Sequence, residues 1–528
     1  MMLNRQKPPR SNPPQVATNY LVCSTLVGYV LLLAIYYVGR YGGNWAELDS
    51  SVLSKITRNF IENRQLVPNS GEVYPNGYSY QSLTTFITIL TGLAVADLQQ
   101  LVYPLTAILA VLPAWLLYYE LTGSLKGTIL ATLLLFTQPE FLFVLFRSSH
   151  EKFTRSLMLL SLFFLVKSFE KQRHSGKSIP YVILFYFAIY TLMSFNNLMG
   201  ASFIFALFLT AVIAVPVGKR GLQLWHQALL RFRYIVLTCL VLAYLFTFYI
   251  YPPATHDLVF LRNIWDRAIA LFLSTPKEPD IPVSDLIGWI NPIVYLLLSL
   301  STWLITLAAF GIWLGMGWKW LVKQEKPDSS VLSFVWLLYL GFGIQGVLSW
   351  VADKSGSGGH LVYRLFPSIS LLSVALVGRF LANWKPHNYI RVWKVGLAFA
   401  IACLAFVSIL KVTNEPALSN KWTFYSISEL AALDWTDKTI QYSQVWTDFD
   451  ERLSVAYAIA RGESKNHNDF YGYELRETIT RYLLDTSLNR LRSKRLQKVM
   501  PFPPGTLLIY DNGEAQLHRL YPKTPFQD

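Results

Sequence analysis

The first apolar segment of the chain reads TNYLVCSTLVGYVLLLAIYYV (residues 18–38) and carries no charged side chain. About 20 such residues are enough for a helix to cross the ~30 Å hydrocarbon layer of a bilayer. Together with ten further segments of this kind it predicts about 11 transmembrane helices. The ten lie at 99–119, 125–146, 156–170, 179–195, 198–216, 234–251, 291–314, 331–350, 365–382 and 395–412.

The composition of the whole chain is typical of a polytopic membrane protein. Its 528 residues are 53% hydrophobic and only 15% charged, and the mean hydropathy is +0.34. The net charge of +14 comes from Lys and Arg in short loops, where anionic lipid headgroups lie. We therefore expect membrane lipids as partners and no nucleic acid. The three cysteines fall inside predicted spans, so none is placed for a disulfide in the external loops.

The basic residues also predict the orientation of the chain. With 11 spans, the basic clusters all fall on one side of the membrane, which is then the cytoplasmic side. These clusters lie at 5–10, 126, 167–177, 219–233, 319–326 and 379–394. We therefore expect a multi-pass protein of the plasma or inner membrane, with a cytoplasmic N-terminus and an extracytoplasmic C-terminal region.

After residue 412 the composition changes to that of a soluble domain. We expect a transmembrane domain over 1–412 and an extracytoplasmic α/β domain over 413–528. In the second domain the pattern predicts a helix at 426–435, a strand at 441–448, and one or two basic helices within 472–500. It also predicts a hairpin of 506–510 with 515–520, turned at Asp511-Asn512-Gly513.

The outer loop 39–98 begins with two acidic residues. Asp49-Ser50-Ser51 is typical of a helix N-cap, and an amphipathic, interfacial helix is expected to follow it. Asp49 is then either a cap or a functional carboxylate. Glu47 favours the second reading, because positions two apart in extended chain point the same way. The two carboxylates could share a cation or divide the roles of base and ligand.

The second outer loop, RSSHEKFTR (147–155), places five ionisable groups between two spans. Charges so close to hydrocarbon are costly unless they are paired or functional. The structural alternative here is an i,i+4 ion pair between Arg147 and Glu151.

A glycine pattern, GFGIQG (341–346), matches a dinucleotide-binding motif. It lies in an apolar span with no strand before it. The small residues therefore predict close packing between helices instead.

Four segments resemble one known family, in the family's order. They are Glu47-Leu-Asp49, Tyr74-Pro75 with Gly77, Arg147-Ser148 with its acidic loop, and Gly358-Gly359-His360 through Arg364-Leu-Phe366. A fifth, weaker match is Thr275-Pro-Lys-Glu278. The chain thus resembles the C-type (GT-C fold) membrane glycosyltransferases that use polyprenyl-linked sugars. It is most similar to the catalytic subunit family of oligosaccharyltransferase.

This resemblance implies an all-α polytopic fold, a small extracytoplasmic α/β domain, and transfer of a sugar or oligosaccharide from a polyprenyl-(di)phosphate donor to an outer acceptor. The implied roles are catalysis by Asp49 and Glu47, donor phosphate binding by Arg364, Tyr363, His360 and Arg147, metal binding by Glu47, Asp49, Glu151 and Glu278, and acceptor binding by Trp446 and Asp448. Mg or Mn is implied for a diphosphate donor and no metal for a monophosphate.

Two departures from the family's pattern concern the metal and the acceptor. Thr154 and Arg155 stand where the family has its acidic pair, and Trp446-Thr447-Asp448 lacks the family's second Trp. An acceptor other than an Asn-containing sequon, whether protein, lipid or glycan, is therefore expected.

The chemistry of glycosyl transfer from a lipid phosphate supports the same residues without the resemblance. A planar guanidinium at Arg364 can take two oxygens of a leaving phosphate, and a carboxylate can deprotonate the acceptor. Arg364 could instead be an interfacial anchor. The main alternative function is a transporter or flippase of a lipid-linked glycan, which should carry broken helices and ionisable groups inside its spans. The predicted spans are nearly free of charge.

Overall fold

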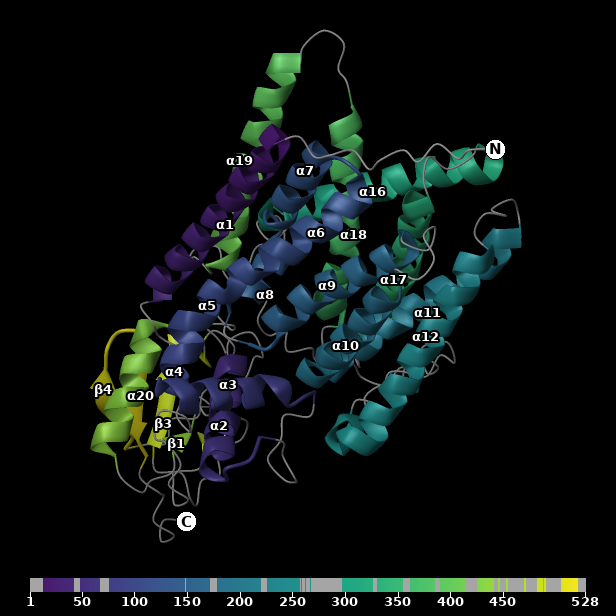
Figure 1. Cartoon of the computed structure of the whole chain (residues 1–528). Coiled ribbons are helices and arrows are strands. Elements are labelled where there is room, and N and C mark those ends of the chain that lie inside the picture. The colour runs from purple at the N-terminus through teal and green to yellow at the C-terminus, as the bar shows by residue number, and fades with distance from the viewer. Residues whose placement is uncertain are drawn as a thin grey trace, which may run out of the picture.

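A computed structural model describes most of the two regions. The described residues are 13–41, 48–66, 76–147, 149–170, 178–219, 226–256, 297–325, 330–354, 361–384, 390–413, 425–440, 445–446, 470–471, 482–487, 489–490 and 505–520, with 258, 262, 266 and 453 singly. They form a long helical bundle with a small sheet at one of its ends, beside the short helices α2 and α3 (Figure 1).

Among the described residues, the helical elements follow one another without an intervening strand up to α20. They are α1 (Pro13–Tyr41), α2 (Leu48–Glu62), α3 (Ser79–Thr91), α4 (Val95–Asp97), η1 (Leu98–Val102), α5 (Tyr103–Leu105), η2 (Thr106–Ala110), α6 (Val111–Thr122), α7 (Leu125–Leu135), α8 (Pro139–Phe146), α9 (Glu151–Glu170), α10 (Ile179–Phe195), α11 (Asn197–Lys219), α12 (His226–Leu245), η5 (Phe246–Ile250), η6 (Pro252–Thr255), α16 (Leu300–Gly317), η7 (Trp318–Val322), α17 (Ser330–Lys354), α18 (Leu361–Asn383), α19 (Ile390–Val412) and α20 (Ile427–Thr439).

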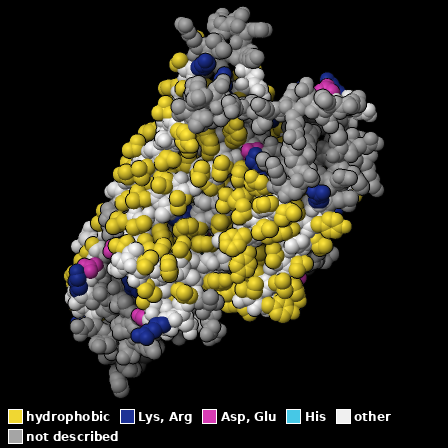
Figure 2. Space-filling model, in the orientation of Figure 1, with side chains coloured by type: hydrophobic (Ala, Val, Ile, Leu, Met, Phe, Trp, Pro, Cys, Tyr) yellow, Lys and Arg dark blue, Asp and Glu magenta, His cyan; other side chains and the backbone are white. Residues whose placement is uncertain are grey.

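Within this described part, 7 helices are individually long and apolar enough to cross a membrane, or 8 if the bent pair α7–α8 is one span. Hydrophobic side chains cover the flank of the bundle in Figure 2, and the charged ones gather toward its ends. Large apolar side chains such as Leu32, Phe187 and Leu307 are more than half exposed. A belt of this extent is expected to face lipid. The expected all-α polytopic fold is confirmed, while the count of 11 spans stays a prediction.

The predicted span 125–146 is not straight, which corrects the expectation. Its two halves, α7 and α8, meet at an angle of 71°. Pro139 lies in the first turn of α8, and Gln138 before it is extended, as a residue before proline prefers to be. The Thr137 carbonyl at the break accepts hydrogen bonds from Ser301 Oγ at 2.6 Å and from Ser408 Oγ. Neighbouring helices thus satisfy backbone that the break leaves outside the helix.

The glycine-rich segment of α17 packs against α11, as the sequence predicts. A Cβ added at Gly341 would meet Thr210 Oγ1 and lie 2.7 Å from the carbonyl oxygen of Ala206. A Cβ at Gly346, on the same helix, would meet nothing within 4 Å. The glycine at 341 is therefore required by close approach of two helices.

The two glycines give a matched pair of substitutions. Gly341→Ala should lower the free energy of unfolding by about 1–3 kcal/mol, the usual cost of overpacking. Gly346→Ala should be neutral or stabilising, because alanine favours the helix without a clash. Thermal unfolding in detergent measures both, and equal stability of the two variants would show that 341 is not a close contact.

The C-terminal region is built on a 5-stranded sheet with strand order β2-β1-β3-β5-β4. Its strands are β1 (Val445–Trp446), β2 (Phe470–Tyr471), β3 (Tyr482–Thr486), β4 (Leu507–Asp511) and β5 (Ala515–Arg519). Helix α20, capped by Ser426 and Glu429, buries Ala432 and Leu433 in the core it shares with the sheet. The predicted α/β character is confirmed.

One predicted turn is confirmed in this sheet and one predicted helix is wrong. Antiparallel β4 and β5 are joined at Asp511–Gly513, where Gly513 has φ +89°. By contrast, β3 lies within 472–500, which the sequence pattern predicted as helical. Residues Leu483 to Thr486 are buried between β1 and β5, and this pairing on both sides overrides the local pattern.

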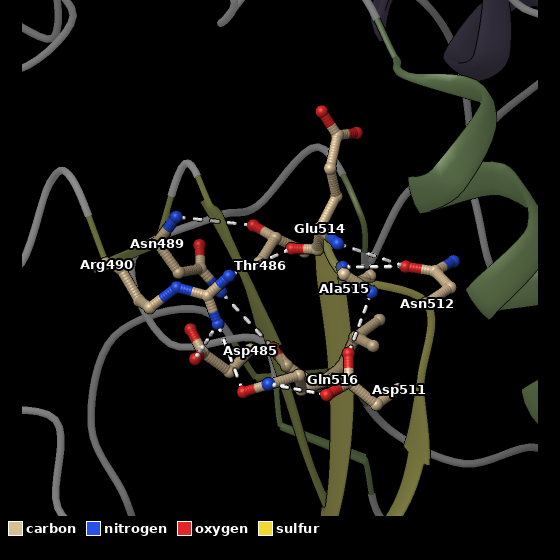
Figure 3. Close-up of polar contacts among 11 residues, drawn as sticks. Asp485, Thr486, Asn489, Arg490, Asp511, Asn512, Glu514, Ala515 and Gln516 are labelled. Carbon is tan, nitrogen blue, oxygen red and sulfur yellow. Dashed lines mark hydrogen bonds and ion pairs between the residues drawn. The ribbon is translucent and has the colours of Figure 1, made fainter.

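A polar network closes the turn of this hairpin (Figure 3). Arg490 Nη1 donates to Asp485 Oδ2 at 2.8 Å and to Gln516 Oε1 at 3.2 Å. Its Nη2 donates to the carbonyl of Glu514 at 3.2 Å. Burial raises the pKa of the Asp485 carboxyl, and Arg490 opposes that shift. Arg490 therefore binds Asp485 within the domain.

Candidate functional site

The ionisable segment between α8 and α9 folds into the protein. Arg147 Nη2 lies 2.8 Å from Glu151 Oε2, and its Nε donates to Ser149 Oγ at 2.9 Å. The guanidinium also lies over the ring of Phe143, 5.1 Å from the centroid. The i,i+4 ion pair is therefore present, and Glu151 starts α9, where a carboxylate is favoured by the helix dipole.

His150 is also buried, and it connects this segment to the first outer loop. Asn196, in the break between α10 and α11, places its Nδ2 2.6 Å from His150 Nε2. On the other side of the same break, the Asn197 N–H donates to the Asn76 carbonyl at 2.5 Å. A Cβ at Gly77 would lie 2.5 Å from the Ser194 carbonyl, so only glycine fits this approach. The Asn76–Gly77 segment and the start of α9 are thus held together by one helix break.

Arg155 joins α9 to α18 and is fully buried. Its Nη1 donates to Ser368 Oγ at 3.4 Å and lies 3.7 Å from Met158 Sδ. Position 364 precedes Ser368 by four residues, which is about one helical turn on the same face of α18. The backbone at Arg364 therefore lies about one turn from the contact between α18 and the cationic start of α9.

Lys152 lies between this polar cluster and an apolar cavity. Its Nζ is 5.6 Å from the centroid of the Tyr103 ring. The cavity has a volume of about 170 Å³ and follows α9 from Lys152 to Leu160, with Thr106, Leu145 and Phe195 on its walls. The cationic segment and an apolar cavity therefore lie next to each other, with Lys152 between them.

The backbone of Asp49 is placed by helix α2. Helix α2 begins at Leu48, so Asp49 lies inside the first turn and is not the residue before the helix. Leu53, one turn later, is fully buried in a cluster with Tyr80, Tyr103 and Phe195, against which Phe153 of α9 packs. Helix α2 thus packs into the same apolar cluster as Phe153, near the start of α9. Leu48 and Asp49 are both helical, while Glu47 lies outside the described residues, so the relative orientation of the two carboxylates stays a prediction.

Several predicted site residues lie outside what the structure describes. Glu47, Glu278, His360 and Asp448 are outside the described residues entirely. For Asp49, Tyr363, Arg364 and Trp446 the structure describes the backbone but not the surroundings of the side chain. Their proximity to one another stays a prediction. The described residues add Asn196 and Arg155, whose sequence signal is a polar residue beside a long apolar run.

Of the four carboxylates predicted to bind a metal, the structure describes the side chain of Glu151 alone. Among the described residues, no three His, Cys, Asp or Glu side chains come together as a metal site. Glu151, one of the four predicted ligands, has its carboxylate 2.8 Å from Arg147, which already balances its charge. Glu151 is therefore a poor metal ligand in this arrangement, and Glu47, Asp49 and Glu278 are the remaining predicted ligands.

Comparison by sequence gives no relative: no family model matches the chain, and no curated protein matches it. Comparison by structure does. The oligosaccharyltransferase AglB from the archaeon Archaeoglobus fulgidus, in complex with an inhibitory peptide and a dolichol-phosphate, aligns with a TM-score of 0.56 at 12% identity, over 90% of this chain and 70% of AglB. ArnT from Cupriavidus metallidurans, bound to undecaprenyl phosphate, aligns with a TM-score of 0.51 at 13% identity, over 95% of this chain and 98% of ArnT.

Both of these proteins are C-type glycosyltransferases. The two alignments cover nearly the whole chain, so the likeness includes the bundle and the elements that follow it. At these identities the likeness concerns the fold and not the individual residues. The chain therefore has the fold of the C-type membrane glycosyltransferases, as its four short motifs predicted.

Proposed function

We propose that this protein is an integral-membrane glycosyltransferase. It takes a sugar or oligosaccharide from a polyprenyl-(di)phosphate donor and transfers it to an acceptor on the extracytoplasmic side of the membrane. The reaction releases an anionic lipid phosphate, so the site needs preorganised positive charge close to the membrane surface.

The observation that carries this proposal is the buried cationic cluster at the start of α9. The segment 147–155 holds the partly buried Arg147 and the buried Lys152 and Arg155, and Arg147 pairs with Glu151 of the same segment. Arg155, in the second turn of α9, donates to Ser368, in the third turn of α18, and so joins these two helices at the cationic segment. Positive charge preorganised at this place would stabilise the phosphate of a lipid-linked donor.

The cavity beside Lys152 fits the second half of such a donor. Its walls are almost entirely apolar and run along α9 away from the charged cluster. A polyprenyl phosphate has the same division, with an anionic end and an apolar chain. AglB and ArnT have each been solved with a lipid phosphate, dolichol-phosphate and undecaprenyl phosphate respectively, which supports this donor class.

We further propose that the donor is a monophosphate and that arginine, without a metal ion, binds the leaving phosphate. The ion pair of Glu151 with Arg147 supports this proposal, because it engages one of the four predicted metal ligands. If the donor is a diphosphate, Glu47, Asp49 and Glu278 would hold Mg or Mn, which would balance the second phosphate. Transfer that persists in excess EDTA supports the monophosphate, and transfer that EDTA abolishes and Mg restores contradicts it.

A transporter or flippase of a lipid-linked glycan is the second candidate, and one observation favours it. The break between α7 and α8 and the ion pair of Glu140 with Lys411 are features expected of transporters. In this protein, however, both charges have further partners: Thr302 of α16 donates to Glu140, and Lys411 donates to Ser299, the residue before α16. Both activities can be measured in proteoliposomes loaded with lipid-linked sugar. Transfer to an acceptor without movement of the donor between leaflets supports the enzyme, and movement without transfer supports the transporter.

Arg364→Lys tests phosphate binding against membrane anchoring. Lysine keeps the charge and can still reach the interface, but it loses the planar grip on two oxygens. We expect normal insertion and a loss of about 1.5–3 kcal/mol in the use of the lipid-linked donor, seen as a lower kcat/KM. Arg379→Lys, at the other end of α18, is the control and should be silent. Equal donor use by wild type and the Arg364 variant would remove Arg364 from the site.

A further inference from the structure

A second cavity, of about 370 Å³, separates α19 from α1 and α7. Its walls are Tyr29 of α1, Leu130 and Leu133 of α7, and the small side chains Ala398 and Ala402 of α19. Ligand sites in proteins commonly measure ~300–1,000 Å³. Only 11% of the span Lys394–Val412 is buried, the lowest share among the candidate spans, so this groove lies along the helix that packs least tightly on the bundle.

The groove has a closed end inside the membrane. Thr137 lines it there, and its carbonyl accepts hydrogen bonds from Ser301 and Ser408, which hold α16 and α19 against the break after α7. The wall formed by α19 runs from Lys394 to Ala405. At ~1.5 Å per residue this is a depth of about 16 Å, half of the ~30 Å hydrocarbon layer. The groove therefore has the depth of one leaflet and suits an acyl chain.

The open end of the groove is positively charged. Lys394 lines it and is exposed. Lys126, also exposed, lies on α7 four residues before Leu130, so it occupies the same face of the helix one turn nearer this end. Both helices begin at this end and come together at Thr137 and Ser408. Two lysines from two helices thus stand at the mouth of an apolar groove.

We propose that this groove binds one acyl chain of an anionic phospholipid, whose phosphate lies between Lys126 and Lys394. The charge of the mouth favours an anionic headgroup over a zwitterionic one. The sugar donor is a different ligand at a different place. Ser368, near the start of α18, contacts Arg155 of the candidate site, whereas Arg379, near the end of α18, donates to the Thr122 carbonyl at 3.5 Å, next to the turn before α7. The two sites therefore belong to opposite ends of the same helix.

Native mass spectrometry of the full-length protein in detergent tests the proposal, with phosphatidylglycerol and phosphatidylcholine as the added lipids. Wild type should retain one phosphatidylglycerol per chain in preference to phosphatidylcholine. Replacing both lysines, Lys126→Ala with Lys394→Ala, should weaken retention by roughly tenfold or more. Ala402→Leu should also weaken it, because the added side chain occupies the groove.

Two matched variants are the controls. Lys323→Ala removes an exposed lysine that follows η7, and Ala400→Leu adds the same volume to α19 at a position that does not line the groove. Both should retain phosphatidylglycerol as wild type does. Equal retention of the two phospholipids, equal retention by the double-lysine variant and wild type, or displacement of phosphatidylglycerol by polyprenyl phosphate would each overturn the proposal.

Discussion

Replacing Asp49 with Asn should lower glycosyl transfer by about 10²-fold or more and leave the protein folded in the membrane. Loss of a positioned general base has an effect of this size, because the acceptor then attacks without transfer of its proton. Asp49 lies in the first turn of α2, one turn before Leu53, whose cluster includes Phe153 of α9 at its edge. The measurement is the initial rate of transfer from a lipid-linked donor in proteoliposomes at matched protein levels.

Glu62→Gln provides the control for Asp49, because Glu62 is an exposed carboxylate at the other end of the same helix. It should leave the rate unchanged. A normal rate for Asp49→Asn would contradict the catalytic role. The substitution should then cost up to about 1 kcal/mol of stability, since an acidic residue in the first turn interacts favourably with the helix dipole.

The transmembrane helices could be predicted from the sequence because hydropathy is a local property. Residues 18–38 and 395–412 fall within α1 and α19, and the four short motifs indicated the fold that structural comparison supports. The bend at Thr137 was missed although Pro139 marks it. An apolar run is continuous in sequence whether or not its helix is, so hydropathy does not report the break.

The candidate site could be predicted only in part. Arg147 and Glu151 are four residues apart, and their pairing follows from helix geometry. Arg155 and Ser368, or His150 and Asn196, are brought together by the packing of separate helices. No local pattern specifies such partners. The strand β3 was missed for the same reason, since its neighbours β1 and β5 come from before and after it in the chain.

One charged pair, of Glu140 with Lys411, lies inside the nearly charge-free spans. Lys411 Nζ of α19 lies 2.7 Å from Glu140 Oε1 of α8 and donates to Ser299 Oγ at 2.6 Å. Thr302 of α16 donates to the other carboxylate oxygen of Glu140. Three elements from distant parts of the chain thus meet at two opposite charges. Because α19 leads to the C-terminal region, this pair fixes the point where that region leaves the membrane domain.

Glu140→Gln should therefore lower the free energy of unfolding by about 3–5 kcal/mol, because it leaves the ammonium of Lys411 in the bundle without its counter-charge. Adding Lys411→Met should recover most of this loss, since an apolar side chain of similar length needs no partner there. Asp434→Asn breaks an exposed i,i+4 pair with Lys438 on α20 and is the control, with an expected change within about 0.5 kcal/mol. Denaturation in detergent compares the variants. If Glu140→Gln costs no more than Asp434→Asn, or if the double variant is less stable than the single one, then the attraction between Glu140 and Lys411 does not hold α19 to the bundle.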